Sequence, residues 1–130
     1  MISKKKDGCV FCHIEKGMRV FDSKYWYVIY DKYPVNEGHM LLISQRHVES
    51  YFDLREEESS RINNYIHYMK SKIEEKYDPD GYNIGINVGE VAGQTVDHLH
   101  IHLIPRYEGD IDNPEGGVRG VIPDKRMYRK

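Results

Sequence analysis

The sequence predicts an α+β fold: a mainly antiparallel sheet of about five strands, one long helix and a short helical turn near residues 12–16. Two observations carry this prediction. Most candidate strands follow one another through loops too short for crossover helices, which favours antiparallel pairing. A long helical period occurs once, over residues 62–73, and gives way to a period of two after residue 81.

Residues 19–21 and 25–30 are rich in aromatic and β-branched side chains and are separated by three polar residues, so we expect a hairpin. A loop follows, because Pro34, Asn36 and Gly38 are typical loop residues. The segment HMLLIS, residues 39–44, is the third expected strand.

Asp53 and Glu56 resemble a capping box at the start of the helix. The helix ends near the DPDG segment at 78–81, and a half-buried strand follows over 82–88. A glycine-bearing loop, 89–96, then leads to a last strand, 97–104, which Pro105 closes.

The chain has 130 residues and a formal charge of −2, which predicts one domain and disfavours binding to long nucleic acid. We expect a single domain over 1–130, with 1–7 and about 108–130 as terminal extensions. There is no apolar run of signal-peptide or membrane-spanning length, so we expect a cytoplasmic protein with no membrane contact.

Three histidines, His98, His100 and His102, alternate with aliphatic residues near the end of the chain. This spacing places the imidazoles on one face of a strand and the aliphatic side chains on the other. The outer two Cα atoms would lie about 13 Å apart, too far to share one metal ion. Two neighbours could share a metal, as in a His-x-His pair, or the central His100 could act as a nucleophile.

The segment GEVAGQT, residues 89–95, suits a phosphate group beside these histidines. Its glycines allow close approach of backbone amides, and Gln94 and Thr95 add polar side chains. Asn87 precedes the loop and can border the same site.

The only two cysteines form the pair Cys9-x-x-Cys12. In a reducing compartment this pair favours a metal site or a redox role over a structural disulfide.

The segments DHLHIHLIPR (97–106), AGQT (92–95), NVGE (87–90) and GHMLLISQRH (38–47) together resemble the histidine triad (HIT) family. The resemblance spans about residues 9–106. It implies a HIT-like fold, a homodimer with a continuous sheet, and hydrolysis or transfer of small nucleotides. The segment GGVRGVIPDK, 116–125, resembles the tails of family members that hydrolyse diadenosine polyphosphates.

The resemblance also implies roles for individual residues. His100 corresponds to a nucleophile that attacks the α-phosphorus and forms a nucleotidyl-imidazole intermediate. His102 corresponds to a histidine that contacts phosphate, and His39 to a further histidine of the site. With Gln94 of the loop, these three histidines are the expected catalytic residues. The remaining expected nucleotide-binding residues are those of the phosphate loop, the ribose contacts and the base pocket: Gly93, Gln94, Thr95, Asn87, Asp31, Phe11 and Ile14.

One branch of the family carries a structural zinc ion. The resemblance places its ligands at Cys9, Cys12, His47 and His98, a Cys2His2 set typical of a closed tetrahedral site, with one ion per chain. A thioredoxin-like redox pair is the alternative, although no βαβ context surrounds it.

We therefore expect a hydrolase that acts at the α-phosphate of a dinucleoside polyphosphate or nucleoside phosphoramidate, releases a nucleoside monophosphate and needs no catalytic metal. Two other classes remain open. One is a nucleotide-binding module without turnover, and the other is a metallohydrolase that uses His98 and His100 as ligands.

Overall fold

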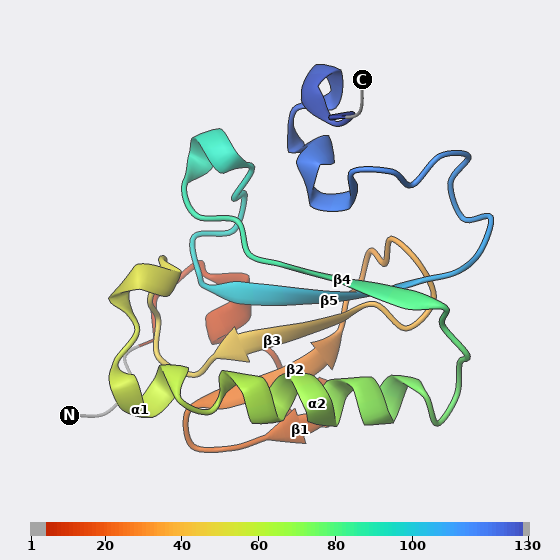
Figure 1. The fold of residues 1–130 in the computed structure, drawn as a ribbon. Coiled ribbons are helices and arrows are strands. Elements are labelled where there is room, and N and C mark those ends of the chain that lie inside the picture. Colours follow the sequence, from red (N-terminus) through yellow and green to blue (C-terminus); the bar gives the residue numbers. More distant parts are fainter. Residues whose placement is uncertain (1–4, 129–130) are drawn as a thin grey trace.

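The computed structural model describes residues 5–128 and contains one five-stranded antiparallel sheet (Figure 1). The strand order is β1-β2-β3-β5-β4, so the last strand lies between β3 and β4. The strands are β1 (Phe21–Asp22), β2 (Trp26–Tyr30), β3 (Met40–Ser44), β4 (Gly81–Gly85) and β5 (His100–Arg106). The predicted α+β class is confirmed.

Two helices follow β3, where the sequence predicts one helix that begins near Asp53. They are α1 (Glu56–Ser59) and α2 (Ile62–Ile73), with a turn at residues 60–61. The expected Asp53–Glu56 capping box is wrong, because Asp53 ends a separate 3-10 turn, η3 (Tyr51–Asp53). Instead, the Glu58 carboxylate accepts the backbone N–H of Arg55 at 2.8 Å.

Helix α2 covers one face of the sheet (Figure 1). Side chains alternate along each strand, so every second residue meets this helix. The main core lies here and contains Trp26, Val28, Met40, Leu42, Met69, Ile73, Leu99, Ile101 and Leu103, all essentially inaccessible to solvent.

The opposite face carries a smaller cluster formed by Tyr27, Ile29, Leu41 and Ile43, with Phe11 and Ile14 packed against it. Residues 10–12 form a 3-10 turn, η1 (Val10–Cys12), and a second turn, η2 (Lys16–Met18), follows. The predicted helical turn near 12–16 is thus two short 3-10 turns. The N-terminal segment therefore packs on the face of the sheet opposite α2.

Two further segments lie over this same face (Figure 1). One is the 89–95 loop with its turn η4 (Glu90–Ala92), and the other is the C-terminal segment with turns η5 (Gly117–Val121) and η6 (Pro123–Lys125). Strand β4 is shorter than predicted, and Ile84 on it is 52% exposed because β4 is an edge strand. No helix among residues 5–128 has the length and apolarity to cross a bilayer.

Candidate active site and metal centre

Strand β5 and the residue before it place the three histidines in different surroundings. Its register sets His100 opposite Ile43 and His102 opposite Leu41 and Gly85, on the face away from α2. His98 comes just before the strand and is completely buried. The aliphatic partners Leu99, Ile101 and Leu103 fill the main core, as the alternation predicts.

A cavity of about 380 Å³ opens in front of His100 and His102. The site residues that the sequence predicts for the base, the ribose and the phosphate line it: Phe11, Ile14, Asp31, Asn87, Gly93 and Thr95. Gly93 has a φ of +95°, a backbone conformation that glycine adopts without strain and that lets the loop turn over the cavity. The structure thus brings together residues that are as many as 91 positions apart in the chain, from Phe11 to His102.

The hydrogen bond of His100 determines which of its nitrogens is free. Its Nδ1 lies 2.8 Å from the carbonyl oxygen of His98. A carbonyl oxygen only accepts, so Nδ1 carries the proton and donates. In the neutral ring Nε2 therefore keeps its lone pair, which is the form that a nucleophile requires.

A second chain of hydrogen bonds orients His102. The backbone N–H of Val35 donates to Nδ1 of His39 at 3.0 Å, so the proton of the neutral His39 ring is on Nε2. This Nε2 lies 2.9 Å from Nδ1 of His102 and donates to it. His102 then carries its own proton on Nε2, which makes it a hydrogen-bond donor at that atom.

The environment keeps this pair of rings neutral. Burial is the main cause that lowers the pKa of His102 to about 4, with additional effects of His100 and His39. Burial also lowers the pKa of His39, although the Asp31 carboxylate, 3.4 Å from its Nε2, acts in the opposite direction. Both rings are consequently neutral at pH 7.

Asp31, His39 and His102 lie close enough together to suggest a cation site. The Val35 N–H excludes His39 from it, because a ring that accepts at Nδ1 has a proton rather than a lone pair at Nε2. The His-x-His metal site is also disfavoured: among residues 5–128, no potential metal-binding cluster contains both His98 and His100. No sequence pattern points to Val35, since its contribution is a backbone N–H.

Gln94 lies in the 89–95 loop but does not line the cavity. Its Oε1 accepts the Gly89 N–H at 2.9 Å, and its Nε2 donates to the carbonyl oxygens of Glu49 and Val96 at 2.9 and 3.1 Å. The side chain is 7% exposed. Its amide group is therefore occupied in fixing the loop, whereas the sequence suggested direct contact with phosphate.

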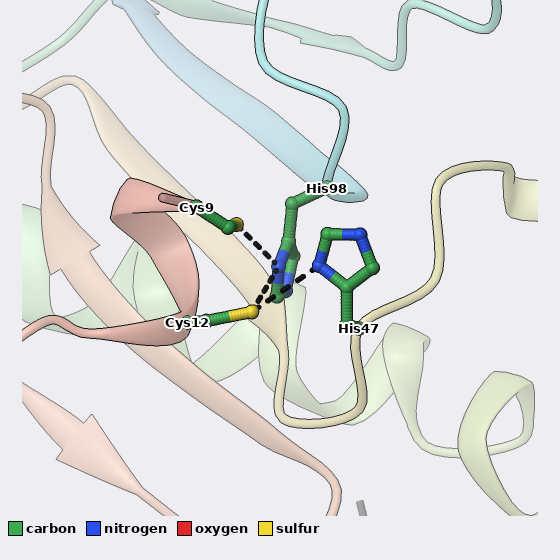
Figure 2. Close-up of side chains that lie close together, drawn as sticks. All are labelled: Cys9, Cys12, His47 and His98. Carbon is green, nitrogen blue, oxygen red and sulfur yellow. Dashed lines mark hydrogen bonds between the residues drawn. The ribbon is translucent and has the colours of Figure 1, made fainter. Parts of the chain in front are cut away.

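Four predicted metal ligands gather beside the active site. Figure 2 shows Cys9, just before the η1 turn, and Cys12, at its end, directed toward the rings of His47 and His98. The two Sγ atoms and the two ring nitrogens all lie within 4.8 Å of one another.

The distances suit tetrahedral zinc. Sγ of Cys9 and Sγ of Cys12 lie 3.3 and 3.5 Å from Nδ1 of His98, and Sγ of Cys12 lies 3.2 Å from Nδ1 of His47. Tetrahedral zinc would hold sulfur and nitrogen ligands about 3.6 Å apart. Nε2 of His98 donates to the carbonyl oxygen of Ser44 at 2.7 Å, which leaves the lone pair on Nδ1, facing the thiols.

The candidate metal centre and the cavity in front of His100 both depend on the η1 turn. Cys9 and Cys12 contact the two histidine ligands, while Phe11 between them lines the cavity, with its ring centre 5.0 Å from that of His100. The hydroxyl of Tyr27 donates to the carbonyl oxygen of Phe11. The position of the cavity wall therefore depends on the same short turn that supplies both thiols.

Comparison with known proteins agrees with this arrangement. A family profile described as "HIT domain" matches residues 15–109. An uncharacterized HIT-like protein of Methanocaldococcus jannaschii is 39% identical over 108 residues, which cover 78% of this chain and 81% of that protein. An AP-4-A phosphorylase of Mycobacterium tuberculosis is 34% identical over 97 residues, 74% of this chain but only 50% of that protein.

A solved structure described as a zinc-bound histidine triad family protein from Mycobacterium smegmatis is also similar. It superimposes with a TM-score of 0.70 at 33% identity and covers 79% of this chain and 78% of that one.

Proposed function

Because the chain belongs to the histidine triad family, we propose that it cleaves small nucleotides at the α-phosphate through a covalent nucleotidyl-His100 intermediate. The substrate is a dinucleoside polyphosphate or a nucleoside phosphoramidate, and the product is a nucleoside monophosphate. The observation that carries this proposal is the Nε2 lone pair of His100, fixed by the 2.8 Å bond of Nδ1 to the His98 carbonyl, at the wall of the 380 Å³ cavity.

In the first step, Nε2 of His100 attacks the α-phosphorus. A P–N bond forms, and the bond to the leaving group breaks with its electron pair on the leaving group, which takes up a proton from solvent. The ring then carries a positive charge, and its Nδ1–H bond to the His98 carbonyl becomes charge-assisted and stronger. In the second step, water cleaves this P–N bond and releases the monophosphate with the ring restored.

The neighbours of His100 meet the negative charge of the phosphoryl oxygens. His102 offers its Nε2–H, and Thr95, which lines the cavity at the end of the 89–95 loop, would add its hydroxyl group. The His102 donor is fixed before the substrate arrives, so it requires little reorganisation during the reaction. Phe11 and Ile14 would contact the base, and Asp31 the ribose hydroxyls.

Relatives support this chemistry. The Mycobacterium tuberculosis protein is named as a phosphorylase of diadenosine tetraphosphate, and a Dictyostelium discoideum relative, 40% identical over 80 residues, is named as a bis(5′-adenosyl)-triphosphatase. Each matches this chain over about half of its own length, 50% and 54% respectively. The exact substrate of this chain is therefore proposed from partial matches.

The test compares wild type with His100→Ala on diadenosine tetraphosphate and adenosine 5′-phosphoramidate. We expect the variant to fold, to bind AMP and to lose at least about a thousandfold in kcat. Full turnover by a folded His100→Ala protein would disprove the assignment. Wild-type protein that binds AMP but hydrolyses neither substrate would instead identify a binding module.

We further propose that Cys9, Cys12, His47 and His98 hold one structural zinc ion per chain. The ion would supply a cross-link between the N-terminal turn and the residue that precedes β5, and the proposed chemistry does not use it. The test is metal analysis: wild type should contain about one equivalent of zinc, and the Cys9→Ser, Cys12→Ser double variant should contain none.

We also propose a cytoplasmic homodimer. Strand β4 is an edge strand with a 52% exposed Ile84, and an unpaired edge can extend a sheet across two chains. Light scattering should give about twice the chain mass of 15.4 kDa, and Ile84→Lys should lower it toward that of one chain. A monomeric wild type would refute the dimer.

A further inference from the structure

The Val35 N–H sets the proton positions of His39 and His102, yet its own residue does little to hold it in place. Residues 34–38 form no helix or strand, and the Val35 side chain is 66% exposed. This loop, between β2 and β3, lies beside the end of β5 (Figure 1). The position of the N–H therefore depends on the contacts that its neighbours in the loop make with β5.

Asn36, the next residue in the chain, ties the loop to β5 with its side-chain amide. Its Nδ2 donates to the carbonyl oxygen of Pro105 at 3.0 Å and to Oδ2 of Asp110 at 2.7 Å. Its own carbonyl oxygen accepts the backbone N–H of His39 at 3.2 Å. An amide nitrogen carries two hydrogens, so both are used and the orientation of the side chain is fixed.

Asp110 is in turn fixed by the residue that ends β5. Arg106 donates from Nε and Nη2 to the two carboxylate oxygens, at 2.8 Å each, and the backbone N–H of Tyr107 adds a third bond at 3.0 Å. A bidentate pair of this kind defines geometry as well as charge. The Arg106 guanidinium also holds the pKa of the Asp110 carboxyl well below its usual range, so the group remains an acceptor at neutral pH.

The segment around Arg106 has two more contacts that keep it in place. The hydroxyl of Tyr107 donates to the carbonyl oxygen of Glu37 at 2.8 Å, which gives the loop a further point of attachment. Nη1 of Arg106 donates to Oδ1 of Asn83 on β4 at 2.6 Å. The end of β5 is thus joined both to the neighbouring strand and to the loop, and it provides a rigid base for Asn36.

We propose that Asn36 and Asp110 are positioning residues for the reaction, which act through the orientation of His102. Their hydrogen bond keeps the Val35 N–H on Nδ1 of His39, and His39 therefore remains the donor to His102. Neither Asn36 nor Asp110 lines the nucleotide cavity. The inference rests on the proposed function, because the Nε2–H of His102 affects turnover only where it meets a substrate phosphate.

Loss of this anchor should change the protonation of His39. Once the Val35 N–H moves away, Nδ1 is free to take up a proton, and the Asp31 carboxylate, 3.4 Å from Nε2, stabilises the charged ring. The titratable groups that face His39 are Asp31 and His102, and His102 is neutral. The pKa of His39, which burial lowers in wild type, should therefore rise, and a ring turned toward Asp31 leaves His102 without its donor.

The first test follows the histidine rings without turnover. Wild type, Asn36→Ala, Asp110→Ala and the double variant are labelled with ¹⁵N-histidine, and their imidazole spectra are recorded against pH. We expect a higher pKa of His39 in each variant, with its acid dissociation constant lowered about tenfold, and unchanged signals of His100. Either single variant is sufficient for the test if the other does not fold.

The second test measures steady-state hydrolysis of adenosine 5′-phosphoramidate. In either single variant kcat should fall about tenfold while KM stays within about twofold, because the change acts on a donor to the transition state and not on the cavity lining. If both residues act through one bond, the double variant should lose no more than the more impaired single variant. Asp110→Asn keeps an acceptor oxygen and should retain more activity than Asp110→Ala.

Glu37→Ala is the matched control. Glu37 is exposed and adjoins Asn36 in the same loop, and within residues 5–128 its side chain makes no hydrogen bond, while the carbonyl oxygen that Tyr107 uses is kept. The control should keep the wild-type kcat within about twofold and the wild-type His39 spectrum.

An unchanged His39 pKa in the folded single variants would overturn the inference, even if kcat falls, because the loss would then have another cause. Equal effects of Glu37→Ala would also overturn it. Wild type that does not hydrolyse nucleotides would instead overturn the proposed function, whereas the spectra would still show whether the anchor orients His39.

Discussion

Replacement of both cysteines by serine is expected to weaken nucleotide binding as well as to remove zinc. The reason is the η1 turn, in which Phe11 lies between Cys9 and Cys12 and forms part of the cavity wall. Without the cross-link to His47 and His98, the turn keeps the Tyr27 hydrogen bond and the packing of Phe11 on the sheet, and nucleotide binding itself must supply the rest of its order. Ordering backbone costs about 1–2 kcal/mol per residue, so the cavity wall would become partly disordered.

The magnitude follows from what Phe11 contributes. An aromatic side chain stacked on a base is worth about 1–3 kcal/mol, which corresponds to a roughly 5- to 150-fold change in Kd. Neither cysteine lines the cavity, so loss of zinc would affect the cavity only through the turn, whose residues Val10 and Phe11 do line it. We therefore expect the double variant to bind AMP about 5- to 150-fold more weakly than wild type.

The assay is calorimetric titration of AMP into four proteins: wild type, Phe11→Ala, the double cysteine variant and the triple variant. If the linkage runs through Phe11, the triple variant should bind no more weakly than the double variant. Met18→Ser, at a 70% exposed position of η2, is the control and should keep both zinc and affinity. Unchanged AMP affinity in a folded, zinc-free double variant would show that the η1 turn does not couple zinc to nucleotide binding.

Further predictions concern the hydrogen-bond chain and the loop. His39→Phe removes the donor to Nδ1 of His102 and should lower kcat about 10- to 100-fold, whereas His39→Gln, which can still donate, should retain more activity in the same steady-state assay. The pKa of His102 is about 4 in the folded protein and about 6.5 in the unfolded chain. As the pH falls, the unfolded chain therefore binds a proton at His102 before the folded protein does. The contribution of neutral His102 to the free energy of unfolding is therefore complete above pH 6.5 and declines as the pH falls toward 4. The urea midpoint of His102→Asn should consequently fall less steeply over this pH range than the midpoint of wild type. Gln94→Leu leaves the Gly89 N–H and two carbonyl oxygens without their partner and should cost about 2–4 kcal/mol in urea unfolding; a loss below about 0.5 kcal/mol would contradict the bracing role.

Periodicity was sufficient for the sheet and for the face of each histidine, because alternation in a strand is a local property. It failed at the start of the helical region, where Asp53 and Glu56 have the right spacing for a capping box. There the buried Glu58 instead pairs with Arg46 at 2.8 Å, an interaction between distant residues that no local pattern reveals. The exposure of Ile84 has the same origin, since edge position depends on strand order.

The site shows a similar division. The sequence motifs predict which residues line the cavity and which four residues form the candidate metal site. They do not predict how each side chain is oriented. Gln94 stands in the motif yet turns its amide toward Gly89 and Glu49, because buried backbone groups there need partners. Val35 has an aliphatic side chain with no sequence signal, yet its N–H sets the proton positions of two histidines.

The formation of a bond between Nε2 of His100 and the α-phosphorus is tested most directly by rapid quenching during the first turnover, followed by mass spectrometry of the peptides. We expect one nucleoside monophosphoryl group per active chain, located on His100 and absent in His100→Ala. A burst of product with no labelled peptide, or a label on His102 instead, would contradict it.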